Sequence, residues 1–444
     1  MTHHLAAYLC ICGNKTAAPQ PPSQNNKMKL RDKNCTAKLA FSILLLVLLY
    51  ASCKKDESSG SRTELTLDSI FLYARQIYLW NHALPSYDVF NPRNRYGTFA
   101  NELEAFKTEL FDISQLPTDP ATGHPYETPY SAGIPKYSYL EKGTLAPGNS
   151  VAGMNIDQAA FHASLIRAGE NKIAYLAFGS FPRLSSCKAE LDAIFSRFAQ
   201  ASPHDMIIDL RNNSGGFIEA AEYIANLLAP PSLDGKIMFA EEFNSQMQNG
   251  KAAILKHQPY LDENGKPVIY KGRYATLADV DYTEAGNTFR FSKKGSLESI
   301  TDLYFITSTA TASASEMLIS CMKPYLPVTI VGEKTYGKPV GFFGVNIDQY
   351  SVWFSGFLIK NASGWSGYFS GMNPDLYVKG EREPASGDPD EICLSATLAL
   401  INRKAGSRSF KKEQVAVIKT FSQISAPSVK MSAAGMISTR LKLK

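Results

Sequence analysis

The sequence predicts an α/β protein with a mostly parallel sheet, preceded by a small, mainly helical amino-terminal domain. From Lys172 onward, short apolar runs alternate with longer helical patterns, which is the order of elements in βαβ units. Before that point, apolar residues recur at the spacing of one helix face, as at Ile70, Tyr73, Ile77 and Trp80. The absence of a repeat of about 20 to 50 residues argues against a solenoid.

The composition is that of a globular chain with a large core. Of 444 residues, 44% are hydrophobic. The chain contains 46 Lys and Arg and 41 Asp and Glu, which gives a formal charge of +5. This excludes a disordered or collagen-like protein. The seven Cys contain no CxxC pair and form neither a disulfide framework nor a zinc cluster. No metal or cofactor is implied.

The first 52 residues are expected to be a leader. An apolar run at 39–51 follows a basic segment and is too short for an ordinary membrane helix, so we interpret it as a secretory signal peptide. It ends in small residues before Cys53 and resembles the lipobox of bacterial lipoproteins. This resemblance implies that Cys53 is lipidated and becomes the first mature residue. The alternative is a short buried helix that ends in an ordinary cysteine.

Within the leader, Met28 is the expected start, residues 1–27 a mis-called extension and residues 28–52 the signal peptide. The leader contains six Lys or Arg and one Asp, so it accounts for the whole net charge. The charge therefore gives no support to a nucleic-acid partner. A linker at 53–64 follows.

The mature chain is expected to contain three parts. The helical domain spans 65–150, with helices near 65–84 and 99–110, and the core spans 151–404. The basic tail at 405–444 is interpreted as partly packed on the core, a flexible arm being the alternative. Within the core we expect strands at 173–178, 206–210, 303–307 and 328–331, and helices at 189–198, 218–228 and 313–322.

Three loops follow the carboxyl ends of predicted strands: 209–216 (DLRNNSGG), 311–316 (TASASE) and 332–339 (GEKTYGKP). Parallel strands place such loops at one edge of a sheet, where ligands bind in open α/β folds. The three loops can therefore meet in space although they are distant in sequence.

These loops carry the residues of an acyl-transfer site. Ser313, at the start of a helix, is a candidate nucleophile that needs a base. The sequence has no His after His257, and His162 and His204 are interpreted as surface or packing residues. Lys338 is the better base, provided that burial lowers its pKa.

The backbone N–H groups of Gly215, Gly216 and Ala314 would bind the developing oxyanion. Each of these residues also has a plain structural interpretation. Ser313 with Glu316 fits a helix capping box, Lys338 fits a solvated loop, and two adjacent glycines fit an ordinary turn. Their co-occurrence after three strands of one sheet favours the chemical interpretation.

Together with a fourth motif at 371–375 (GMNPD), the three loops resemble the C-terminal processing (tail-specific) peptidases over roughly 172–401. The resemblance implies a core related to the Clp protease and crotonase fold, with Ser313 as nucleophile, Lys338 as general base, and the amides of Gly215, Gly216 and Ala314 as the oxyanion hole. Leader and motifs together resemble lipoprotein members from the Bacteroidetes.

The chain departs from the family pattern at two points. Phe342 stands where many members have a Gln that orients the lysine. The segment between Leu140 and Lys172 is too short for the complete PDZ domain that many members insert.

The functional expectation is a lipid-anchored serine endopeptidase of the cell envelope, in the periplasm or at the outer membrane, acting on polypeptides through an acyl-enzyme. The alternative is a catalytically silent lipoprotein that binds a peptide or a hydrophobic ligand on the same fold. Intact Ser313, Lys338 and glycine residues favour the enzyme, whereas Phe342 and the missing PDZ domain favour the binding protein.

Overall fold

The computed structural model describes residues 59–129, 131–143, 161–262, 265–379, 387–404, 415–422, 436–437 and 441–444. The chain from Gly60 to Lys444 forms one compact unit. The predicted leader, including Cys53, lies outside the described residues. In the described part of the chain, no helix is both long and apolar enough to cross a bilayer.

A seven-stranded sheet forms the centre of the core, in the order β14-β11-β10-β4-β3-β2-β15. The five strands from β14 to β3 are parallel, and β2 and β15 continue the sheet in antiparallel pairing. The predicted α/β class with a mostly parallel sheet is thereby confirmed. The strands are β2 (Phe161–Ala168), β3 (Asn171–Phe178), β4 (Asp205–Asp209), β10 (Asp302–Thr307), β11 (Val328–Gly332), β14 (Leu376–Tyr377) and β15 (Val415–Ser422).

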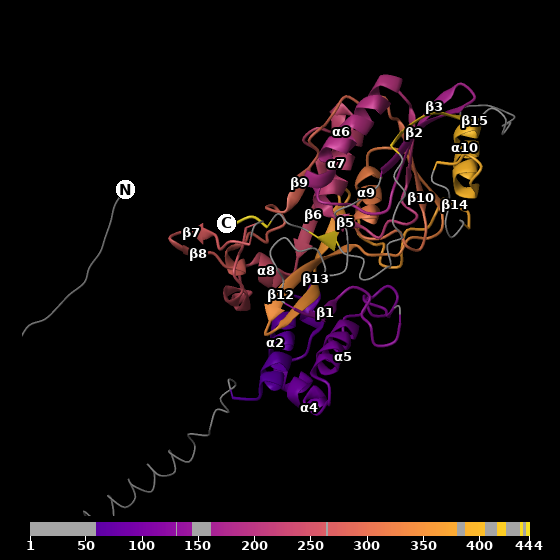
Figure 1. Cartoon of the computed structure of the whole chain (residues 1–444). Coiled ribbons are helices and arrows are strands. Elements are labelled where there is room, and N and C mark those ends of the chain that lie inside the picture. The colour runs from indigo at the N-terminus through magenta and orange to yellow at the C-terminus, as the bar shows by residue number, and fades with distance from the viewer. Residues whose placement is uncertain are drawn as a thin grey trace, which may run out of the picture. The chain divides into compact units, whose positions relative to one another are not determined.

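Helices cover both faces of this sheet (Figure 1). On one face, α6 (Leu184–Ala201), α7 (Ile218–Leu228) and α9 (Ala314–Met322) share a hydrophobic core with the inward side chains of the strands. On the other face, α10 (Ile392–Lys404) packs on strand residues such as Ile207. Because both faces are covered, the central strands read as continuous apolar runs, which made them recognisable in the sequence.

A second, antiparallel sheet was not predicted. It has the order β1-β13-β6-β9, and β12 also pairs with β13. Nearly every residue of the long β13 is buried, but Ser351, Ser355 and Gly356 interrupt its apolar residues. The strand therefore shows neither a period-two alternation nor the continuous apolar run of the central strands. The strands are β1 (Tyr139–Lys142), β6 (Ile237–Phe243), β9 (Thr288–Arg290), β12 (Val340–Ile347) and β13 (Tyr350–Asn361), and β7 (Ile269–Tyr270) with β8 (Arg273–Tyr274) forms a separate hairpin.

The amino-terminal helices pack against the second sheet. The predicted helix near 65–84 corresponds to α2 (Arg62–Ile77), which begins at a capping box of Ser61 and Glu64. The helix ends before Trp80, which was predicted to lie on its apolar face and instead precedes a 3₁₀ turn. The helix predicted near 99–110 is α5 (Glu102–Gln115). The short α3 (Tyr87–Phe90) and α4 (Pro92–Tyr96) lie between them, and α8 (Ser245–Gln248) lies later in the chain; 3₁₀ turns occupy Asn81–Ala83, Pro231–Leu233, Ala253–His257 and Leu277–Asp279.

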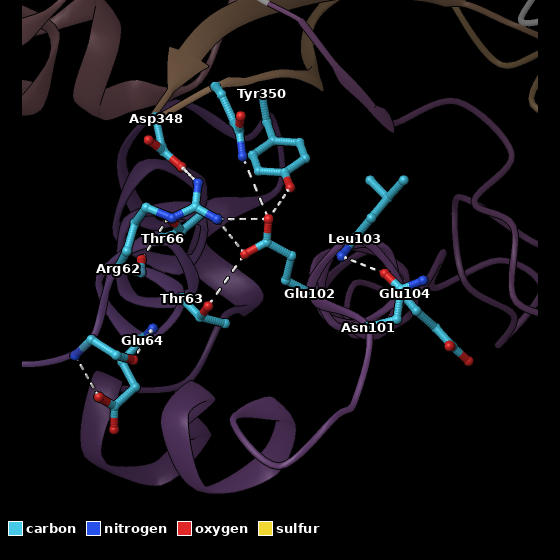
Figure 2. A network of polar contacts seen from close by, with 12 residues as sticks. Arg62, Thr63, Glu64, Thr66, Asn101, Glu102, Leu103, Glu104, Asp348 and Tyr350 are labelled. Atoms are coloured by element: carbon cyan, nitrogen blue, oxygen red, sulfur yellow. Dashed lines mark hydrogen bonds and ion pairs between the residues drawn. The ribbon is translucent and has the colours of Figure 1, made fainter.

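A polar network joins the helices to the β12–β13 hairpin (Figure 2). The Arg62 guanidinium donates to Glu102 Oε1 at 2.7 Å and to Asp348 Oδ2 at 2.6 Å. The Tyr350 hydroxyl donates to the same Glu102 oxygen at 2.7 Å. About half of the Arg62 side chain is exposed, so solvent screens this network.

The carboxyl-terminal tail adds strands to the core. β15 pairs with β2 at the edge of the large sheet, and β16 (Met436–Ile437) pairs in parallel with β5 (Gly216–Phe217). Beyond it, Leu443 forms a bridge with Val280.

We expect apolar packing, rather than the exposed ion pairs, to hold the helices on the second sheet. Phe106 is buried on α5 with its ring edge-to-face against Tyr350. Phe106→Ala should lower the free energy of unfolding by about 3–5 kcal/mol, whereas Arg62→Ala should lower it much less, because solvent screens its ion pairs. Urea unfolding of both variants checks this. Equal losses would contradict it.

Candidate active site

Ser313 lies between β10 and α9 in a strained backbone conformation. Its φ is +62° and its ψ is −117°, a region that residues with a side chain rarely adopt. The residue is fully buried, and among the described residues its Oγ has no hydrogen-bond partner. Strain of this kind persists where the surrounding structure enforces it, which is frequent at functional sites.

The glycine turn of the first loop lies directly against Ser313. A Cβ on Gly215 would stand 2.7 Å from Ser313 Cβ, and a Cβ on Gly216 would stand 2.2 Å from the Phe181 carbonyl oxygen. Both glycines also have positive φ. No side chain fits at either position, so the backbone alone can approach the serine.

The structure distinguishes among the three predicted oxyanion donors. The Gly215 N–H donates to Asn213 Oδ1 at 2.9 Å and is therefore already engaged. Ala314 is the first residue of α9, so its N–H has no acceptor within the helix. Gly216 and Ala314 are therefore the better candidates for oxyanion donors.

Lys338 is almost completely buried, with 1% of its surface exposed. Burial lowers the pKa of its ammonium group well below the usual range, and the negative charges of Glu127 and Glu316 partly oppose this shift. Its Nζ lies 3.4 Å from the centroid of the Phe342 ring. Phe342 thus faces the lysine with an aromatic ring at the position where an amide was expected.

One buried carboxylate links the loop of Ser313 to the loop of Lys338. Glu316 Oε2 accepts the N–H groups of Ser313 at 3.0 Å and Lys338 at 2.8 Å. Its Oε1 accepts the N–H of Gly337 at 2.7 Å and the hydroxyl of Thr335. The capping interpretation had suggested only the first of these bonds. The other three depend on a loop about 20 residues away, which sequence reasoning could not place.

The amino-terminal segment also reaches the site. Tyr137 is buried, donates its hydroxyl to Gly337 O at 2.6 Å, and has its ring centroid 6.0 Å from Lys338 Nζ. Its neighbour Lys136 donates to Phe369 O at 2.6 Å, and burial lowers the pKa of Lys136 to about 8. Sequence analysis identified neither residue, because no motif marks this segment.

Glu127 fixes the segment in place. Its buried carboxylate accepts the N–H groups of Tyr137 at 3.0 Å and Ser138 at 2.8 Å. It also accepts the hydroxyls of Tyr78, Ser138 and Ser355 at 2.7–3.0 Å. The carboxylate thus joins the helical part, the amino-terminal segment and β13 beside the lysine.

A buried ion-pair network holds the first loop. Arg211, with 4% of its side chain exposed, pairs with Asp209 at 2.6 Å and with Glu391 at 2.5 Å. The Tyr175 hydroxyl donates to Asp209 from the neighbouring strand at 2.9 Å. Because a buried charge without its partner is costly, this network holds the loop in one conformation.

The remaining residues singled out in the sequence lie apart from this chemistry. The His162 ring packs edge-on against Tyr175, and His204 forms a hydrogen bond with the Ser299 carbonyl. Cys187, Cys321 and Cys393 are free and buried. Within the described ranges, no group of three or more His, Cys, Asp or Glu is arranged to hold a metal ion.

Residues 172–378 match peptidase family S41. A curated relative, the chloroplastic C-terminal processing peptidase of Tetradesmus obliquus, is 23% identical over 234 residues, which cover 52% of this chain and 40% of that protein. Among solved structures, an S41-family protein from Bacteroides fragilis has a TM-score of 0.46 at 17% identity, covering 76% of this chain and 97% of that one. The photosystem II D1 C-terminal processing protease has a TM-score of 0.44 at 15% identity, covering 76% and 97%.

Residues 172–378 are thus a peptidase family S41 domain. The predicted resemblance to the C-terminal processing peptidases and the fold class that it implied are confirmed. The matched range contains Ser313, Lys338 and the glycine turn, but it leaves out Glu127 and Tyr137.

The lowered pKa of Lys338 has a consequence for stability. In the folded chain the amine stays unprotonated down to a pH well below 10.5, whereas the unfolded lysine holds its proton up to about pH 10.4. The wild-type free energy of unfolding should therefore rise with pH between these two pKa values. Lys338→Met lacks this dependence. Its free energy of unfolding minus that of wild type should therefore fall by about 1.4 kcal/mol for each pH unit between the two pKa values.

Urea unfolding between pH 7 and pH 10 measures this difference. The exposed Lys107→Met on α5 is the matched control, because it makes the same substitution at the protein surface. A constant difference for Lys338→Met would show that the folded lysine is protonated.

Proposed function

We propose that this chain is a serine-type endopeptidase that uses Ser313 and Lys338 as a catalytic dyad. Ser313 Oγ attacks the carbonyl carbon of a peptide bond while the neutral Lys338 amine takes its proton. The oxyanion forms against the N–H groups of Gly216 and Ala314. Lys338 then donates the proton to the leaving amine, and a water molecule releases the acyl group from Ser313 by the reverse sequence of transfers.

The observation that carries this proposal is the carboxylate of Glu316. It accepts the backbone N–H groups of both Ser313 and Lys338, so one buried side chain fixes the two loops together. A helix cap alone requires no bond to Lys338. The burial of Lys338 lowers its pKa and so favours the neutral form, in which a lysine can act as a base.

Phe342 is compatible with this mechanism. The ring face lies against the amine and does not itself donate a proton to the nitrogen. In the alternative function, a silent binding lipoprotein, the same pocket would hold a ligand without turnover. The two functions differ in their dependence on Ser313.

We expect Ser313→Ala to lower kcat/KM for a peptide substrate by at least about 10⁴-fold, because no other group replaces the attacking oxygen. Ser320→Ala is the matched control, since Ser320 is buried on the same helix and its Oγ also has no hydrogen-bond partner among the described residues. That variant should retain wild-type turnover. Cleavage by a clean Ser313→Ala preparation would refute the mechanism.

The proposed location is the cell envelope, with a lipid anchor on Cys53. The support is the sequence pattern of a basic segment, an apolar run and small residues before the cysteine. In a bacterial host, Cys53→Ala should abolish incorporation of an alkyne-labelled fatty acid and release the protein from the membrane fraction. Cys187→Ala, which removes a buried thiol, is the control. Unchanged labelling of Cys53→Ala would contradict the anchor.

A further inference from the structure

The strand that carries the proposed oxyanion donor has two edges, and one of them is occupied by Phe181. The Phe181 N–H donates to Gly215 O and the Phe217 N–H donates to Phe181 O, both at 2.9 Å. Successive peptide groups of an extended strand point to opposite edges. The N–H and carbonyl of Gly216 itself therefore face the other edge of β5.

That other edge is covered by the chain's own carboxyl-terminal tail. β16 pairs in parallel with β5, with Met436 opposite Gly216 and Ile437 opposite Phe217. β16 also lies against β12, the strand that begins at Val340 shortly after Lys338. In Figure 1 it is the short yellow arrow beside β5. The tail thus runs between the glycine turn and the strand that leaves the lysine.

The end of the tail is also attached to the core. Leu441 O accepts the Tyr260 hydroxyl at 2.7 Å, and the Lys444 N–H donates to Asp279 O at 3.0 Å. These contacts lie on a part of the core remote from Ser313 in sequence, and most of them involve the tail's backbone. The tail is therefore held at two places, at β5 and at the 260–281 region.

We propose that the edge of β5 opposite Phe181 is the docking edge for an extended polypeptide and that the chain's own tail occupies it in competition with the substrate. Backbone pairing of this kind recognises a strand with little dependence on its side chains, as in other cases of strand addition. A substrate must displace β16 before its carbonyl can reach the N–H of Gly216. This inference rests on the proposed function for its consequence, which is inhibition of turnover.

The expected change in apparent KM follows from the covalent link between the tail and the core. A flexibly linked segment has an effective concentration on the order of 1 mM, so a tail that binds with an intrinsic Kd of about 0.1 mM would raise the apparent KM about tenfold. Because the tail competes for the docking edge, kcat should not change.

The test uses the full chain with the double substitution Met436→Pro and Ile437→Pro. Proline has no N–H to donate to the ladder and is poorly accommodated in a paired strand. Ser428→Pro, in the same tail but outside β16, is the matched control. For a reporter peptide, the double variant should show a KM about tenfold lower with the same kcat, whereas the control should match wild type. Adding a synthetic peptide of residues 433–444 to the double variant should restore the higher KM.

A binding measurement separates this inference from the proposed function. In a Ser313→Ala background, a fluorescein-labelled peptide of residues 433–444 should bind the double variant. It should not bind the chain with the wild-type tail or the chain with Ser428→Pro, because their own tails occupy the edge of β5. The same three chains with Ser313 intact are assayed for cleavage. If the labelled peptide binds only the double variant but none of the Ser313-containing chains cleaves a peptide, the docking edge is supported and the peptidase function is refuted. If the Ser313-containing chains cleave peptides but the labelled peptide binds all three Ser313→Ala chains equally, or none of them, the tail inference is overturned.

Discussion

The carboxylate of Glu316 is the interaction on which the site depends. It gathers donors from two loops that follow different strands, and it does so in the interior, where hydrogen bonds to a charged group are strong and an unpaired charge is costly. Burial raises the pKa of this carboxyl, while the bonds from Thr335, Lys338, Gly337 and Ser313 oppose that shift. The positive φ of Ser313 is maintained in this setting, because its N–H is held by the carboxylate.

The two sheets position different parts of this site. In the parallel sheet, β4, β10 and β11 end at the same edge, which brings the three loops together. The antiparallel sheet brings β12, with Phe342, and β1, beside Tyr137, against the lysine. Arg211 ties the glycine loop to the residues before α10. The proposed nucleophile, Ser313, thus lies beside the parallel sheet, and the surroundings of the proposed base, Lys338, are completed by the antiparallel sheet.

The sequence allowed the parallel half of the fold to be predicted, and the other half escaped prediction for physical reasons. Buried parallel strands and amphipathic helices are local patterns, so their order and the meeting of the three loops could be inferred from the residues alone. β13 is buried on both faces, but Ser351 and Ser355 interrupt its apolar residues, so it lacks such a pattern. The engagement of the Gly215 N–H by Asn213 depends on a side-chain rotamer. The contact of Phe342 with Lys338 was visible in the sequence only as a missing glutamine, because the direction of a ring is set by packing.

Glu127 and Tyr137 have a consequence for how such chains are compared and divided. Both lie ahead of the region that matches the S41 family, yet one contributes charge and the other an aromatic ring to the surroundings of Lys338. A fragment cut at the family boundaries would keep Ser313 and Lys338 but would lose the Glu127 and Tyr137 side chains that lie near the amine. Homologues that align well from 172 to 378 can therefore differ in the basicity of their lysine through residues that such an alignment never includes.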